Sequence, residues 1–162
     1  MKTGFKNILF PTDFSESAEL AVPLARRMAE AFGAQITCLH VAEDPIQEWI
    51  CSWSLVPDTS DTAGAEDSPA GRTAALRQLR TFAERHFGGL GRRASVEVVR
   101  GKPTEEIVRF ARDHGFDLIV MGGRAYGDVE PGLHETTPDR VIRSTSIPVL
   151  TVAEPVPDFI RL

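Results

Sequence analysis

The chain has 162 residues and a formal net charge of −5, with 42% hydrophobic and 25% charged residues. This length and balance are typical of one soluble globular domain with a sizeable core. No apolar run reaches the roughly 18–20 residues of a membrane-spanning helix, and residues 1–6 lack the pattern of a signal peptide, so we expect a cytoplasmic protein without a membrane partner.

The first half of the chain alternates between strand and helix patterns. An apolar run predicts a strand over residues 7–11, and small apolar residues at helical spacing predict a helix over residues 15–32 that ends at Gly33. A second strand is predicted over residues 35–41 and a second helix over residues 72–87. Cys38 lies in that second strand, where its alternation with neighbouring residues predicts a core position.

Between the second strand and the second helix, residues 42–71 contain three prolines and seven acidic residues but no Lys or Arg. We interpret this segment as a long acidic loop. It carries a charge of −7, and since the whole chain carries −5, the remainder carries only +2. A charge distribution of this kind offers no basic surface to DNA or RNA, so we expect no nucleic-acid partner.

The second half continues the alternation. Residues 95–99 predict a short strand, Pro103 begins a helix, residues 117–121 predict a buried strand, residues 138–143 a short helix, and residues 149–152 a last strand. Strands that alternate with helices along a whole chain are typical of βαβ units and of a mainly parallel sheet. The predicted fold class is therefore α/β.

Four short motifs carry a resemblance to a known family. They are Ile8-Leu9-Phe10-Pro11-Thr12-Asp13, Leu39-His40-Val41, Gly101-Lys102-Pro103, and the stretch from Asp117 to Gly122 followed at fixed distance by Arg140-Val141 and by residues 146–150. In this order and spacing, they make residues 7–152 resemble the universal stress protein family.

The resemblance implies an adenine nucleotide alpha hydrolase-like, Rossmann-like fold. In that fold a single open sheet of five parallel strands has the order 3-2-1-4-5, with helices on both faces. The domain is expected to span residues 1–153, with residues 154–162 as a C-terminal tail. The family usually forms homodimers through the last strand, and here Val149, Leu150, Thr151 and Val152 carry no charge that would oppose such pairing.

The nucleotide-binding members of the family share the motif G-x2-G-x9-G-[S/T], which the resemblance places against the phosphates of ATP. An ungapped alignment from Gly122 puts Ala125 at the second glycine, Glu135 at the third and Thr136 at the hydroxyl. Glycine lets backbone amides approach phosphate closely. Glu135 is therefore expected to obstruct phosphate by its bulk and its charge.

Several of these residues also have simpler structural interpretations. Gly122 can serve the turn after its strand, and Thr136 and Thr137 can be the N-cap of the last helix, with phosphate binding as the alternative. At the adenine side, Pro11, Thr12, Asp13 and Val41 match the positions that meet the base in the family. Asp13 can contact the base, cap the helix that begins near Ser15, or do both.

The sequence favours a universal stress protein-like binding or regulatory module with a degenerate nucleotide site, in which ATP binding is weak or absent. No complete P-loop, catalytic Ser-His-Asp set or metal-ligand cluster is found in the sequence, so we expect no catalytic residues, no metal site and no turnover. The alternative is a stress protein that binds ATP or AMP, with Mg²⁺, and acts as a nucleotide-dependent switch with weak ATPase activity.

Overall fold

The fold was analysed in a computed structural model that describes residues 4–43, 69–123 and 135–157. Its strands are β1 (Asn7–Pro11), β2 (Gln35–Ala42), β3 (Ala94–Arg100), β4 (Leu118–Gly122) and β5 (Val149–Val152). Its helices are α1 (Glu16–Phe32), α3 (Pro69–Phe87), α4 (Pro103–Asp113) and α5 (Thr137–Ser144), with a 3₁₀ segment over Gly88–Arg93. No helix in this part of the chain is both long and apolar enough to cross a membrane.

The strands form one sheet in the order β3-β2-β1-β4-β5, and every neighbouring pair is parallel. This confirms the α/β fold class and the strand order that the resemblance implied. The connections from β1 to β2 and from β2 to β3 proceed toward one edge, whereas β4 returns to the other side of β1. The direction of winding therefore changes between β1 and β4, where open α/β sheets bind ligands.

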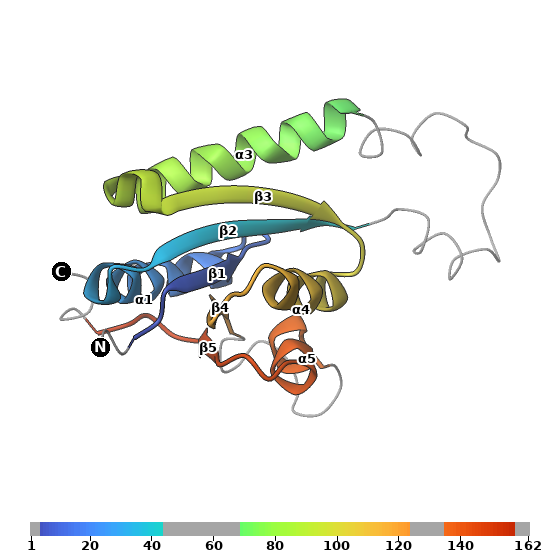
Figure 1. The fold of residues 1–162 in the computed structure, drawn as a ribbon. Helices are drawn as coiled ribbons and strands as arrows, with labels where there is room; N and C mark the ends of the chain where they lie inside the picture. Colours follow the sequence, from blue (N-terminus) through green and yellow to red (C-terminus); the bar gives the residue numbers. More distant parts are fainter. Residues whose placement is uncertain (1–3, 44–68, 124–134, 158–162) are drawn as a thin grey trace, which may run out of the picture.

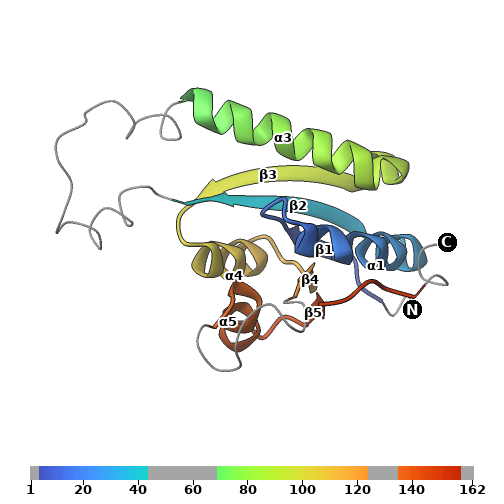
Figure 2. The same ribbon diagram turned by 180° about the vertical axis from the view of Figure 1, so that it is seen from behind.

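Helices cover both faces of the sheet (Figures 1 and 2). On one face α1 and α3 pack against Ile8, Phe10 and Cys38. On the other face the core includes Leu9 and Leu39 of the strands and residues of α4 and α5. Successive strand residues point to opposite faces, so the uninterrupted apolar run of β1 fills both halves of the core.

Helix α1 has well-defined signals at both ends. The Ser15 side chain caps its N-terminus by accepting from the Ala18 N–H, and Gly33 ends it in the left-handed conformation with φ 65°. Its buried positions are mostly alanines, including Ala21 and Ala25. These small residues let the helix lie close against the sheet, which brings its first turn next to the end of β4.

Several element boundaries differ from the prediction, most clearly at α3 and β3. Helix α3 begins at Pro69, so the last residues of the predicted loop 42–71 are helical, because proline is well tolerated in a first helical turn. Strand β3 runs over Ala94–Arg100 and is longer than predicted, because all of its residues pair with β2. Val156 is buried against the α1 side of the core, so packed residues extend past residue 153. The rest of the predicted loop, residues 44–68, lies outside the described residues.

Candidate functional site

A cavity of about 820 Å³ lies at the carboxyl end of the sheet, within the described part of the chain. The ends of β1, β2 and β4 form its floor, and the first turns of α1, α3 and α5 contribute to its walls. Its size is within the range of small-molecule sites, and its place is the one that the winding of the sheet predicts.

Seven of the nine predicted site residues line this cavity, namely Pro11, Thr12, Asp13, Val41, Gly122, Thr136 and Thr137. They come from four different elements and are brought together by the fold. Ala125 lies outside the described residues. Glu135 borders a second, smaller hollow, although it directly precedes two residues that line the cavity.

We call the part of the cavity formed by residues 11–13 and 39–41 the base end, after the positions predicted to meet a base. Here Thr12 is buried, its N–H donates to the Leu39 carbonyl at 2.9 Å, and its Oγ1 accepts from the Phe14 N–H at 3.0 Å. His40 Nδ1 lies 2.9 Å from the Thr12 carbonyl oxygen. Because a carbonyl only accepts, that nitrogen carries a hydrogen. These bonds join β2 to the turn after β1.

Phe14 has a positive φ of 64°, which is rare for an aromatic residue and is sustained only when surrounding contacts impose it. Its ring lies 4.7 Å from the His40 ring and 5.9 Å from the Phe82 ring, measured between centroids. Nothing in the residue type or its neighbours indicates this conformation. His40 supports this turn and also lines the cavity.

Asp13 acts on the start of α1 through another residue. Its Oδ1 accepts from the Ser15 N–H at 3.0 Å and from the Ser15 hydroxyl, while the Ser15 oxygen accepts from the Ala18 N–H at 3.2 Å. Ser15 is therefore the N-cap and Asp13 orients it. The Asp13 side chain is exposed at the cavity margin, so this role is compatible with contact to a ligand.

Gly122 is required by packing between β4 and α1. A Cβ atom at this position would lie 2.2 Å from the Ser17 carbonyl oxygen and 2.8 Å from the Ala18 nitrogen. Its φ is not in the left-handed region, so the turn does not need a glycine here. The interpretation that Gly122 serves the turn is wrong, because the close approach of the two backbones explains the glycine.

The next residue has its backbone groups occupied. The Gly123 N–H donates to the Val152 carbonyl at 2.8 Å, and the Ser17 hydroxyl donates to the Gly123 carbonyl. An amide that is bonded to the neighbouring strand is not free to bind phosphate. Gly122 and Gly123 therefore serve the fold in this structure.

At the start of α5, which we call the phosphate end, the helix satisfies most of its own donors. Thr136 is the N-cap and forms a reciprocal capping box with Asp139. Asp139 Oδ2 is 3.0 Å from the Thr136 nitrogen and 2.7 Å from Thr136 Oγ1. Pro138 has no N–H to donate. Among the residues that the structure describes, Thr137 has no hydrogen-bond partner for its N–H or its hydroxyl, so it is the donor left for a ligand.

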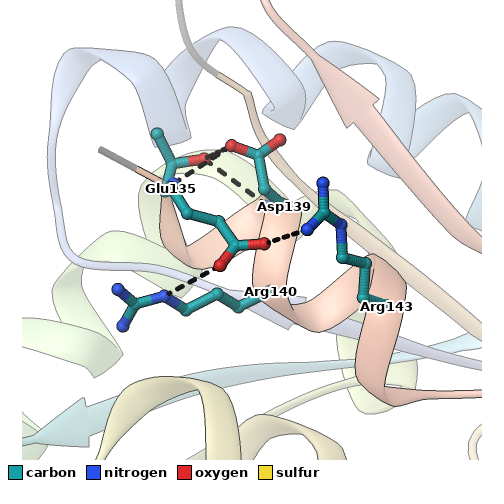
Figure 3. Close-up of polar contacts among 5 residues, drawn as sticks. Glu135, Asp139, Arg140 and Arg143 are labelled. Atoms are coloured by element: carbon teal, nitrogen blue, oxygen red, sulfur yellow. Dashed lines mark hydrogen bonds and ion pairs between the residues drawn. The ribbon is translucent and has the colours of Figure 1, made fainter. Parts of the chain in front are cut away.

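The Glu135 side chain turns back along α5 (Figure 3). Its Oε1 is 2.9 Å from Arg143 Nη1, and its Oε2 is 3.7 Å from Arg140 Nε. All three residues border the second hollow, of about 580 Å³, which adjoins the cavity through Glu43, Pro103 and Thr137. The carboxylate thus lies among arginines, a placement that its position in the motif did not indicate.

Two titratable side chains, Cys38 and His86, pack within the fold and lie outside the cavity lining. Burial raises the pKa of the Cys38 thiol to about 12, which keeps it protonated and confirms its predicted core position. Burial also lowers the pKa of His86, which packs on Phe82 and lies 3.8 Å from Glu19. Within residues 4–43, 69–123 and 135–157, no three His, Cys, Asp or Glu side chains are grouped to hold a metal ion.

Comparisons with known proteins agree on one family. A family model described as the universal stress protein family matches residues 4–153. Universal stress protein MJ0531 of Methanocaldococcus jannaschii is 30% identical over 156 residues, which cover 93% of this chain and 84% of the relative.

Solved structures with the same fold include two that contain nucleotides. A universal stress protein in complex with cAMP superposes with a TM-score of 0.65 at 21% identity and covers 93% of this chain and 98% of its own. The universal stress protein of Archaeoglobus fulgidus in complex with dAMP gives a TM-score of 0.57 at 19% identity, over 91% and 96% of the two chains.

Proposed function

The chain belongs to the universal stress protein family, and from this premise we propose that it is a stress-response binding or regulatory module whose cavity takes an adenine nucleotide. The nucleoside supplies most of the affinity, and a second and third phosphate add little. Adenosine and AMP are thus the ligands expected to bind, and ATP has no advantage over AMP.

The observation that carries this proposal is the cavity itself. All four residues expected to meet an adenine ring line it, together with Gly122, Thr136 and Thr137. Its lining is largely apolar, with Leu39, Val98 and Met121 beside Val41, as suits a flat aromatic base. Structures of relatives in complex with cAMP and dAMP, each a nucleotide with one phosphate, support a ligand of this class.

The small contribution of further phosphates is supported by the donors at the phosphate end. The Gly123 amide bonds to β5, and the Thr136 N–H and hydroxyl bond to Asp139. Polyphosphate sites offer several converging amides, whereas the described residues of α5 leave Thr137 alone at this position. Within residues 135–139, these donors suit one phosphate group and are too few to hold a triphosphate by themselves.

Calorimetric titration of adenosine, AMP and ATP, with Mg²⁺ present, tests this function. We expect adenosine and AMP to bind and ATP to bind no more tightly than AMP. ATP that binds at micromolar concentration while adenosine and AMP do not would contradict the proposal, because the phosphates would then supply the affinity.

We also propose a homodimer joined through Val149, Leu150, Thr151 and Val152. Strand β5 lies at the edge of the sheet, where β4 is its one neighbour, and an uncharged edge can be closed by pairing with a second copy. Leu150→Lys is expected to weaken the dimer, whereas Gln35→Lys, exposed on an inner strand, is not. Sedimentation at micromolar concentration measures both, and a monomeric unaltered protein would contradict the proposal.

A further inference from the structure

We propose that Arg140 and Arg143 act as positioning residues that hold the Glu135 carboxylate outside the cavity, and that this keeps the phosphate end open to the single phosphate of an adenine nucleotide. The inference rests on the proposed function, because it concerns the same cavity. In this proposal the two arginines set the position of the Glu135 side chain, so Glu135 does not permanently obstruct a phosphate.

The backbone of Glu135 lies at the margin of the cavity. It directly precedes the N-cap Thr136, and both Thr136 and Thr137 line the cavity. A glutamate has three rotatable bonds before its carboxylate, so a side chain at this position can turn inward or outward. In the structure it turns outward, and its two oxygens face Arg143 and Arg140 (Figure 3).

The two arginines decide the local charge. Glu135 together with Arg140 and Arg143 carries +1, whereas Glu135 without them leaves −1 beside Thr137. The Asp139 carboxylate is held in the capping box, and Glu105, which also lines the second hollow, pairs with Lys102 at 3.3 Å. A released Glu135 would therefore add a second carboxylate near Thr137, beside Glu43, which lines both the cavity and the second hollow, and would repel a phosphate there.

The arginines affect the cavity through Glu135. Both border the second hollow, and neither lines the cavity. Their side chains are 59% and 77% exposed and that of Glu135 is 37% exposed. Exposed ion pairs are individually weak, so we expect their loss to change phosphate affinity by a few fold.

The test compares AMP with adenosine in four proteins by calorimetric titration. These are the unaltered chain, Arg140→Ala with Arg143→Ala, Glu135→Ala, and the triple variant. Loss of both arginines is expected to lower AMP affinity by about three- to tenfold and to leave adenosine affinity unchanged. In the Glu135→Ala background, the same two substitutions are expected to change AMP affinity by less than about twofold.

The competing explanation is direct attraction between the arginines and the phosphate. It predicts the same loss of AMP affinity whether or not Glu135 is present, and that result would overturn the inference. Adenosine binding distinguishes failure of this inference from failure of the proposed function. If adenosine binds and the effect of the arginines on AMP affinity is independent of Glu135, this inference alone fails. If neither adenosine nor AMP binds the unaltered protein, the proposed function fails and the inference fails with it.

Two controls distinguish the positioning of Glu135 by the arginines from a general effect of positive charge. Arg109→Ala with Arg112→Ala removes two exposed, ion-paired arginines of α4 that line neither the cavity nor the second hollow, and should leave AMP affinity unchanged. Arg143→Lys keeps the positive charge near Glu135 and should retain most of the affinity. A loss in the α4 control as large as in the α5 variant would show an effect of net charge and contradict the inference.

Discussion

The two ends of the cavity are held in place by different kinds of interaction. At the base end, Thr12 bonds through its backbone to β2 and through its hydroxyl to Phe14, and the side chain is buried. At the phosphate end, an exposed capping box and exposed ion pairs arrange Thr136 and Glu135. The base end is thus fixed by the fold, while the phosphate end is set by surface side chains that substitution can rearrange.

Gly122 lines the same cavity but has a packing role. As the first glycine of a phosphate-binding motif it would belong to the phosphate end, but its contact with Ser17 belongs to the packing of α1 on β4. A glycine that matches a motif is therefore not by itself evidence for a phosphate. Substitutions at the base end and at Gly122 should therefore alter stability most, and those at the phosphate end should alter the preference between AMP and adenosine.

Gly122→Ala is expected to have the largest effect. Its Cβ would lie 2.2 Å from the Ser17 carbonyl oxygen, so α1 must shift, and we expect a loss of about 3 kcal/mol or more in the free energy of unfolding. Gly123→Ala is the matched control, because its nearest neighbours lie at 3.5 Å and a loss below about 1 kcal/mol is expected. Urea unfolding measures both; equal losses would show that the close contact is not what requires the glycine.

Thr12→Val should have the next largest effect. The substitution keeps the shape of the side chain but leaves the Phe14 N–H without its acceptor, which is expected to cost about 1–2 kcal/mol of stability. Because Phe14 holds a strained conformation, adenosine and AMP should lose affinity equally. Thr12→Ser keeps the acceptor and should retain ligand affinity. A stable Thr12→Val protein with unchanged adenosine affinity would mean that the hydroxyl does not support the base end.

Thr136→Ala and Thr137→Ala are expected to have different effects, the first on stability and the second on AMP affinity. Thr136 is the N-cap, and its loss is expected to cost about 1 kcal/mol of stability. Thr137 caps nothing, so its replacement should leave stability unchanged and lower AMP affinity by about two- to fivefold, with adenosine unaffected. Thermal unfolding and calorimetry give the two readings. If Thr136→Ala lowers AMP affinity more than Thr137→Ala does, the phosphate contact is made by Thr136, the hydroxyl position of the motif, and the prediction is wrong.

The sequence predicted the elements well because their signals are local. Apolar runs marked β1 and β4, small residues at helical spacing marked α1, and Gly33 marked its end. The strand order came from the resemblance and is confirmed. The base end was also found by its motif positions, and the residues predicted there line the cavity.

The phosphate end depended on contacts across space that the motif does not encode. The direction of Glu135 is set by arginines five and eight residues later on a helix, and the role of Gly122 is set by a carbonyl more than one hundred positions earlier. The positive φ of Phe14 had no signal in its residue type. The sequence does show arginines five and eight residues after Glu135, and this spacing is a signal from which the direction of the carboxylate could have been predicted.

Salt should have the smallest effect and should act at one end alone. The Glu135 pairs are exposed, and raising sodium chloride from about 0.05 to about 0.5 M shortens the screening length severalfold. The arginines then hold Glu135 less firmly and the phosphate itself is screened, so AMP affinity should fall by about twofold. Adenosine is neutral and in the proposed function makes no contact with the phosphate end, so we expect its affinity to stay constant. A parallel fall for both ligands would show that salt changes the whole cavity, and the two ends would then not be independent.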